Sequence, residues 1–416
     1  MGVDAVFELQ YQNLFGAASG YLPTDHRAVF HANRKLQAAA AGAAKVDYPA
    51  SVKALQDLLL NDGIVRMLVT QMIDEVADDH KTVQDVTELL DQLALITKTA
   101  PEWEADKEKR NFFPMSALFT YMMMTEAGEA VFRNRKFNAS LISILKEWCA
   151  YLDSAESAHV LNEGEHGWLS PLAYKYNELQ NFVVPDQGAP HWGWKSWNDF
   201  FHREIKPGVR PIEGEGDPHV VTSPNDGTVY KTARNVALST SFWIKGQPYS
   251  LHDMLNGDPM APQFEGGDVF QSYLSGADYH RWHAPVSGTV VKAEVVEALM
   301  FSNLASQGND IKGTGSQGYY TAVNTRGLLF IEADHKPIGT VVVVPVGITE
   351  VSSIRHTVKV GDHVTKGQEI GRFSYGGSSL ATVWMPGAIN HFTAYAPDNP
   401  DASGAIKVNG QIAVAN

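Results

Sequence analysis

The period of the hydrophobic pattern changes once along the chain, and this change constrains the fold more than any other feature. Up to about residue 160, apolar residues recur at spacings of three and four, as in "TVQDVTELLDQLALITK", which predicts amphipathic helices. After residue 213 the apolar runs alternate or are continuous and are bounded by glycine, as in "GTVVKAEVV", which predicts strands. The sequence therefore predicts an α+β fold, with a helical domain over residues 1–160 and a mainly antiparallel β domain over residues 213–416.

A segment of different composition, residues 161–212, connects the two regions. It is rich in glycine, proline and aromatic residues. We interpret Trp192, Trp194 and Trp197 as an aromatic seam that joins two domains, with a binding platform as the alternative. Within this segment "SWNDFFHREI" predicts a short helix with Ser196 as its N-cap.

Two stretches of the β region repeat one another. "SPNDGTVYK" at 223–231 and "HAPVSGTVVK" at 283–292 share the form Pro-x-x-Gly-Thr-Val, a turn that leads into a strand. Further along, "VKVGDHVTKGQEIG" is typical of the paired hairpins of lipoyl-type folds. We therefore expect barrel-sandwich-like internal repeats. A lipoyl or biotinyl carrier would present one lysine at a tight hairpin, but the corresponding hairpin is "GGSS", which disfavours a carrier function.

Charge and cysteine content limit the compartment and the partners. The formal net charge is −14, which argues against binding to nucleic acid or to anionic lipid surfaces. The single cysteine, Cys149, excludes a disulfide framework and favours a reducing compartment. No apolar run approaches the length of a membrane span, and the first residues lack the pattern of a signal peptide. We expect a cytoplasmic protein without a membrane span.

The stretch "GGSS" at 376–379 offers the clearest chemistry. Gly376 and Gly377 leave the carbonyl before Ser378 open to close approach, so the serine hydroxyl can attack the carbonyl of its own preceding residue. The resulting ester can undergo β-elimination to a dehydroalanine, which hydrolyses to a pyruvoyl group.

A serine nucleophile needs a base, usually a histidine oriented by a carboxylate. The β region offers His280, His283 and Asp226 beside glycine-rich turns. A metal site at the two histidines is a weaker alternative, because their i, i+3 spacing does not place both on one face of a strand.

Four motifs resemble, in order and spacing, those of the phosphatidylserine decarboxylase family: "SPNDGTV", "KGQPYSLHDML", "DYHRWHAPVSGTV" and "KGQEIGRFSYGGSS". The resemblance covers most of the chain. It implies self-cleavage between Gly377 and Ser378 into two chains that remain associated, and a pyruvoyl cofactor derived from Ser378, without pyridoxal phosphate or metal. It also implies that Asp226 and His283 complete a triad with Ser378 for self-cleavage, and that His280 returns a proton after decarboxylation.

Further stretches resemble a soluble branch of that family, namely "APHWGWKSWNDFFHREI" and "IEADHKPIG", together with the helical N-terminal region. This branch implies a free L-amino acid as substrate, and we expect an aromatic one, with tryptophan converted to tryptamine. The alternative substrate is phosphatidylserine, converted to phosphatidylethanolamine, which requires access to a membrane surface. Ser379 stands where the family more usually has threonine, a change that keeps the hydroxyl. The sequence does not identify substrate-binding residues.

Overall fold

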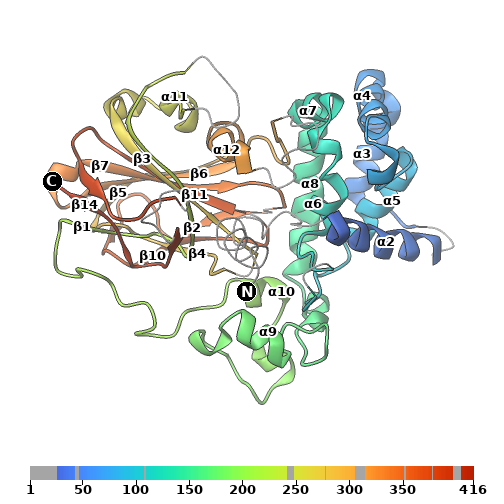
Figure 1. Ribbon diagram of the computed structural model, residues 1–416, viewed down its shortest axis with the longest axis horizontal. Helices are drawn as coiled ribbons and strands as arrows, with labels where there is room; N and C mark the ends of the chain where they lie inside the picture. The colour runs from blue at the N-terminus through green and yellow to red at the C-terminus, as the bar shows by residue number, and fades with distance from the viewer. Residues whose placement is uncertain are drawn as a thin grey trace, which may run out of the picture.

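Helices form the N-terminal part of the molecule, as the sequence predicted. The computed structural model describes residues 26–42, 46–106, 109–240, 248–276, 278–304, 314–350, 353–376, 378–396 and 404–416. The helices of this part stand in a column beside the strands (Figure 1). They are α2 (His26–Gly42), α3 (Ala50–Asn61), α4 (Gly63–Asp74), α5 (Val86–Ile96), α6 (Pro114–Phe119), α7 (Glu126–Arg133) and α8 (Arg135–Leu152).

Short polar side chains fix where several of these helices begin. Asp62 accepts hydrogen bonds from the first free N–H groups of α4, Asp85 does so for α5, and Asn134 for α8. Such caps satisfy donors that have no partner inside a helix. The loops before these three helices therefore end at Asp62, Asp85 and Asn134. The buried apolar residues of the helices belong to one common core.

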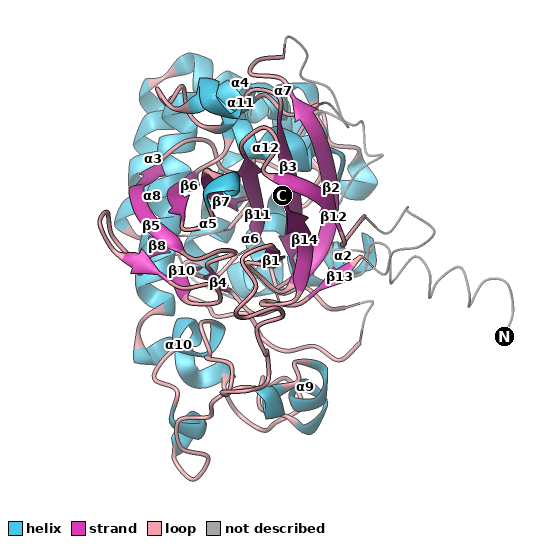
Figure 2. Cartoon of the chain, turned by 90° about the vertical axis from the view of Figure 1, so that its left-hand side faces the viewer, coloured by secondary structure: helices cyan, strands magenta, loops and turns pink. Residues whose placement is uncertain are grey.

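The C-terminal part is built on one curled antiparallel sheet of eight strands, in the order β13-β2-β3-β11-β7-β6-β5-β9 (Figure 2). Two three-stranded sheets, β1-β14-β12 and β4-β10-β8, accompany it. The strands are β1 (Val220–Thr222), β2 (Gly227–Val236), β3 (Gly267–Leu274), β4 (Arg281–His283), β5 (Gly288–Val296), β6 (Arg326–Ala333), β7 (Thr340–Gly347), β8 (Ile354–His356), β9 (His363–Val364), β10 (Glu369–Phe373), β11 (Ser378–Trp384), β12 (Ile389–Phe392), β13 (Ala405–Ile406) and β14 (Gln411–Ala415). The predicted α+β class with a mainly antiparallel β region is confirmed.

The repeated motif has a common structural role in β2 and β5. A Cβ atom added at Gly227 would lie 2.4 Å from the main-chain oxygen of Tyr273, and one added at Gly288 would lie 2.3 Å from that of Glu332. In both repeats the glycine therefore lets the carbonyl of the adjacent strand approach closely. The two strands lie near opposite ends of the eight-stranded sheet.

The helical and β regions share a continuous hydrophobic core. The rings of Phe119 and Phe301 meet edge to face at 5.2 Å, and the side-chain amide of Asn138 bonds both the N–H and the carbonyl of Met300. Because one core includes residues from both regions, the packing does not mark a boundary between domains. The boundaries at residues 160 and 213 remain predictions.

The connecting segment lies below the helical column (Figure 1) and contains α9 (Pro171–Tyr176) and α10 (Trp197–Phe201). Ser196 caps α10 by accepting a hydrogen bond from the N–H of Asp199 at 3.1 Å, as predicted. Trp197 contacts both Trp168 at 4.6 Å and Tyr375 of the β region at 5.7 Å. Trp168, itself in the connecting segment, meets Trp103 of the helical region at 5.4 Å. Trp197 thus takes part in an aromatic seam between the two regions, whereas Trp192 and Trp194 meet Tyr174 and Phe200 of the connecting segment itself.

Candidate active site

Ser378 is the first residue of β11, at the centre of the large sheet. It lies opposite Leu274 of β3 and Gly347 of β7. Its side chain is fully buried, and its Oγ has no hydrogen-bond partner among the described residues. Gly377, the other half of the predicted cleavage site, lies outside the described residues.

The neighbouring serine is already engaged in the sheet. Ser379 Oγ donates to the carbonyl of Ser272 at 2.7 Å and accepts from Gln271 Nε2 at 2.8 Å. A buried polar atom without a partner is costly and calls for an explanation. Of the two adjacent serines, Ser378 is the one whose hydroxyl is uncommitted.

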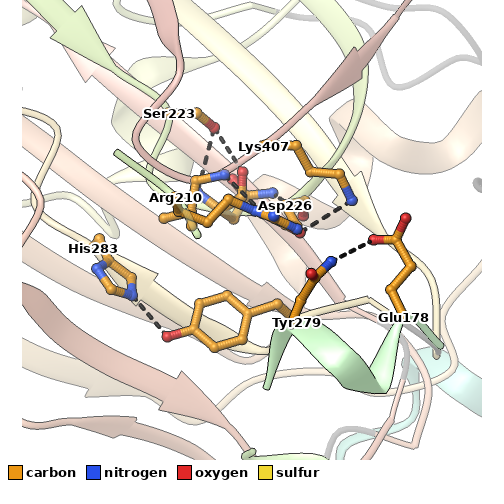
Figure 3. Close-up of polar contacts among 10 residues, drawn as sticks. Glu178, Arg210, Ser223, Asp226, Tyr279, His283 and Lys407 are labelled. Atoms are coloured by element: carbon orange, nitrogen blue, oxygen red, sulfur yellow. Dashed lines mark hydrogen bonds and ion pairs between the residues drawn. The ribbon is translucent and has the colours of Figure 1, made fainter. Parts of the chain in front are cut away.

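His283, the last residue of β4, is held by both ring nitrogens. Nδ1 lies 2.6 Å from the carbonyl oxygen of Gly367, and Nε2 lies 2.8 Å from the hydroxyl of Tyr279 (Figure 3). A carbonyl can only accept, so Nδ1 carries the proton and Nε2 accepts from Tyr279. Burial lowers the pKa of His283, which keeps the imidazole neutral and leaves Nε2 as the basic atom.

Asp226 occupies a buried ionic cluster (Figure 3). Its carboxylate accepts from Arg210 Nη2 at 3.0 Å, Lys407 Nζ at 3.2 Å and the N–H of Val408 at 2.8 Å. No hydrogen bond joins it to His283, and none joins His283 to Ser378, so the structure does not assemble the predicted triad through hydrogen bonds. Burial lowers the pKa of His283, and this is opposed by the hydrogen bond to Gly367, by the charge of Glu369 and, after these, by the charge of Asp226.

His280 has a different environment from His283. It is fully buried, its ring stacks on Phe201 at a centroid distance of 3.9 Å, and neither ring nitrogen has a hydrogen-bond partner in the described part of the chain. Burial, reinforced by the positive charge of Arg203, lowers its pKa well below the ordinary value. An ordinary histidine pKa would suit a proton donor at neutral pH, but burial makes this ring neutral there.

Two further residues of this site were missed in the sequence. Tyr279, which orients His283, directly precedes His280 in the motif "DYHRWHAP", so its position in the motif was an available signal. Arg203 follows α10 and is buried, with its guanidinium 4.3 Å from the centre of the Phe182 ring. Burial lowers its pKa to about 10, while the charges of Asp278 and Asp226 oppose this shift. No local pattern distinguishes this arginine from a surface one.

A cavity of about 330 Å³ opens beside Asp226 and Tyr279. The connecting segment contributes Tyr176 and Phe182 to its wall, and Arg210 and Lys407 supply positive charge. A volume of this size suits a small ligand. A larger cleft of about 770 Å³, between α7, α8 and the β region, contains none of the predicted site residues.

The described residues show neither a metal-ligand cluster nor a helix that could span a membrane. Within the described ranges, no three side chains of His, Cys, Asp and Glu are grouped so that they could hold a metal ion. Over the same ranges, no helix combines the length and the apolar character needed to cross a bilayer.

Comparison with known proteins identifies relatives for both regions. The family model for phosphatidylserine decarboxylase matches residues 197–400, and a second phosphatidylserine decarboxylase model matches residues 49–176. The decarboxylase iboD of Amanita muscaria is 38% identical over 320 residues, which cover 72% of this chain and 90% of the relative. The L-tryptophan decarboxylase of Psilocybe cubensis is 29% identical over 354 residues, 79% of each chain. The phosphatidylserine decarboxylase proenzyme 3 of Schizosaccharomyces pombe is 30% identical over 223 residues, 52% of this chain and 22% of that protein.

Proposed function

Because this chain belongs to the phosphatidylserine decarboxylase family, and is therefore a carboxy-lyase, we propose that it is a pyruvoyl-dependent decarboxylase of an aromatic L-amino acid. The observation that carries the proposal is the buried, unpartnered hydroxyl of Ser378, placed directly after two glycines. The similarity to an L-tryptophan decarboxylase, which extends over 79% of the chain, favours tryptophan as substrate.

The self-cleavage we propose requires no external reactant except water. Ser378 Oγ adds to the carbonyl carbon of Gly377, the C–N bond breaks as the C–O bond forms, and the hydroxyl proton is transferred to the nitrogen of Ser378. Removal of the Cα proton of residue 378 then breaks its Cβ–Oγ bond, so Gly377 leaves as a carboxylate and a dehydroalanine remains. Water enters, ammonia leaves, and residue 378 becomes a pyruvoyl group.

In this proposal His283 Nε2 receives the hydroxyl proton of Ser378. Gly367 holds the ring in the required tautomer, as the Nδ1 contact indicates. To act as base, Nε2 must exchange its present partner, the hydroxyl of Tyr279, for Ser378. The negative charge of Asp226 favours the protonated imidazole that results, so Asp226 can assist without a direct hydrogen bond.

The surroundings of Ser378 fit a pyruvoyl group. Ser378 Oγ is buried and makes no hydrogen bond to a described residue, so its loss on conversion to a pyruvoyl group would break no such bond. Such a group supplies an acceptor for the electrons released when carbon dioxide leaves. Ser378 is fully buried between β3 and β7, which keeps bulk water from this position. We assign to His280 the return of a proton to the substrate Cα. Because burial keeps the free ring neutral, the ring must first take up the proton that the ammonium group of the substrate releases, and it then donates from the imidazolium form.

The cavity beside Asp226 offers the ring surfaces of Tyr176 and Phe182 to an aromatic side chain. Its cations, Arg210 and Lys407, are paired with Asp226. Ser378, His280 and His283 do not line it, so a substrate held there would have to reach past Tyr279 to Ser378. Phosphatidylserine remains the second candidate, since phosphatidylserine decarboxylase models match both regions of the chain. We place the enzyme in the cytoplasm, on the basis of its single cysteine.

Intact mass under denaturing conditions tests the cofactor. We expect two fragments, residues 1–377 and 378–416, the second with a pyruvoyl terminus, and a single uncut chain for Ser378→Ala. An uncut wild-type chain would overturn the proposal.

The substrate is tested by amine formation from tryptophan, phenylalanine, tyrosine, DOPA and phosphatidylserine vesicles. We expect tryptamine from tryptophan. Product from the vesicles alone would establish the second candidate instead.

A further inference from the structure

Tyr375, three residues before Ser378, is enclosed by four aromatic rings. We call these four residues, Phe113, Trp148, Trp197 and Phe201, the Tyr375 cage. Phe113 stacks on Tyr375 with a centroid distance of 5.6 Å, and the other three meet it at 5.4 to 5.7 Å, close to edge to face. Such geometries are the favoured ones for aromatic pairs.

The cage comes entirely from segments that precede the β region. Phe113 lies directly before α6, Trp148 belongs to α8, and Trp197 and Phe201 belong to α10. Tyr375 itself is fully buried. The helical and connecting regions therefore hold a side chain of the segment that leads to the proposed cleavage site.

The main chain around Tyr375 is fixed as well. The N–H of Phe373 bonds the carbonyl of His280 at 3.0 Å, and the N–H of Ser374 bonds that of Ser353 at 2.9 Å. The N–H of Tyr375 donates to the side-chain oxygen of Asn198, in α10, at 3.3 Å. Every residue from 373 to 375 is thus tied to another part of the fold.

On the other side of the proposed cleavage site, β11 is fixed by ladders to β3 and β7 from Ser378 onward. Only Gly376 and Gly377 lie between these two fixed segments. Gly376 has a φ of 141°, in a region of backbone space that favours glycine. The described main chain is therefore held on both sides of the proposed cleavage site, up to Tyr375 and again from Ser378.

The ring of Tyr375, and not its hydroxyl, makes these contacts. The hydroxyl is buried without a hydrogen-bond partner among the described residues. Burial, together with the nearby charge of Glu350, raises its pKa well above the ordinary value, so it remains a neutral phenol. Phenylalanine should consequently replace tyrosine here without loss.

We propose that Tyr375 is a positioning residue for self-cleavage, and that the helical and connecting regions together form a built-in assembly element which makes the chain competent to cut itself. This inference rests on the proposed function. An acyl shift requires Ser378 Oγ and the preceding carbonyl carbon to be held at close approach, and fixing both flanking segments restricts the alternatives to that geometry. The Tyr375 cage supplies one of the two fixed points.

The test compares cleavage rates of the full chain after rapid synthesis or refolding, followed by denaturing electrophoresis. We expect Tyr375→Leu, which removes the ring but keeps most of the volume, to slow cleavage by about tenfold or more. Tyr375→Phe should cleave within about twofold of the wild-type rate, because the cage is preserved.

Phe119→Leu is the matched control for general destabilisation. Phe119 is a buried ring of the helical region that contacts Phe132 and Phe301 and lies outside the Tyr375 cage. The folded fraction of each variant is measured by circular dichroism in a Ser378→Ala background, so that cleavage does not interfere. We expect Phe119→Leu to lower thermal stability yet to cleave at the wild-type rate per folded molecule.

The inference is overturned if Tyr375→Leu cleaves at the wild-type rate per folded molecule, or if Phe119→Leu slows cleavage to the same extent. It is also overturned if Tyr375→Phe is as slow as Tyr375→Leu. A wild-type chain that never cleaves refutes the proposed function itself, and is thereby distinguished from these outcomes.

Discussion

His280 and His283 lie three residues apart but are set up for different protonation chemistry. His283 is held through both nitrogens, by Gly367 and Tyr279, and Asp226 partly offsets the effect of burial on its pKa. His280 stacks on Phe201, and its nitrogens have no described partner. The protonation of each histidine therefore depends on residues from other segments, Gly367 for His283 and Phe201 for His280. The spacing of the two histidines in the sequence does not reveal these contacts.

The first prediction concerns the protonation state of His280. Its pKa is lowered well below the ordinary value by burial, so we expect its imidazole to stay neutral between about pH 6 and pH 8. NMR titration of ¹⁵N-histidine-labelled protein, with His280→Gln used to assign the signal, measures this directly. A His280 signal that titrates near the ordinary histidine pKa would contradict it.

The second prediction concerns Glu350, a buried carboxyl group that joins the β region to α6. It accepts from the N–H groups of Met115 and Ser116 and from the hydroxyl of Ser116. Burial raises its pKa from 4.5 to about 8. Between these two values the folded state binds more protons than the unfolded state, so stability falls as the pH rises through this window.

Glu350→Gln resembles the protonated form and should remove this dependence. We expect the melting temperature of the Ser378→Ala protein to fall from about pH 5 to pH 8, and that of the double variant to fall distinctly less. Parallel curves for the two proteins would show that Glu350 does not titrate in this range.

At the scale of elements, the third prediction tests the glycine of the first repeat. Gly227→Ala places a Cβ atom 2.4 Å from the main-chain oxygen of Tyr273, and a sheet carbonyl has little room to move. We expect a loss of about 1–3 kcal/mol in the free energy of unfolding, measured by denaturant titration of the Ser378→Ala protein. Gly216→Ala is the control, because nothing lies within 4 Å of its added Cβ. Equal midpoints for the two variants would contradict the prediction.

Elements with a local signal were predictable from the sequence. The helical region, the strands and the cap at Ser196 were confirmed, since periodicity and capping depend on near neighbours. The start of α5 has two local candidates, Thr82 and Asp85; Asp85 caps the helix, while the hydroxyl of Thr82 bonds the distant carbonyl of Leu118. A tertiary contact had replaced the local one.

The non-local part of the candidate site could not be predicted. Ser378, His280, His283 and Asp226 were named from motifs, and their catalytic roles remain proposals. The Tyr375 cage has no signal in the sequence, because its rings come from three segments that only the folded chain brings together. Likewise, no sequence pattern indicates that Asp226 bonds Lys407 and Val408 near the other end of the β region.

At the scale of the whole molecule, the fourth prediction is that cleavage leaves one particle. The fragment 378–416, of 39 residues (416 − 377), would carry β11, β12, β13 and β14, whose partners include β3, β7, β2 and β1. Asp226 adds a buried link to Lys407 and Val408. Separating the fragments would require the central sheet to open.

Size-exclusion chromatography of the cleaved protein, with mass spectrometry of the peak, provides the measurement. We expect both fragments in a single peak without denaturant, and two species only when the protein is unfolded. Release of the smaller fragment under native conditions would contradict this prediction.

The central place of β11 also bears on timing. Its ladder joins Ser378 to Leu274, residues far apart in the chain, and such non-local pairings are among the slower events in folding. Under the proposed chemistry, a newly made molecule would gain activity only after a lag that contains this step. An added cofactor could not shorten that lag, because each molecule would form its own pyruvoyl group, once, at the end of its folding.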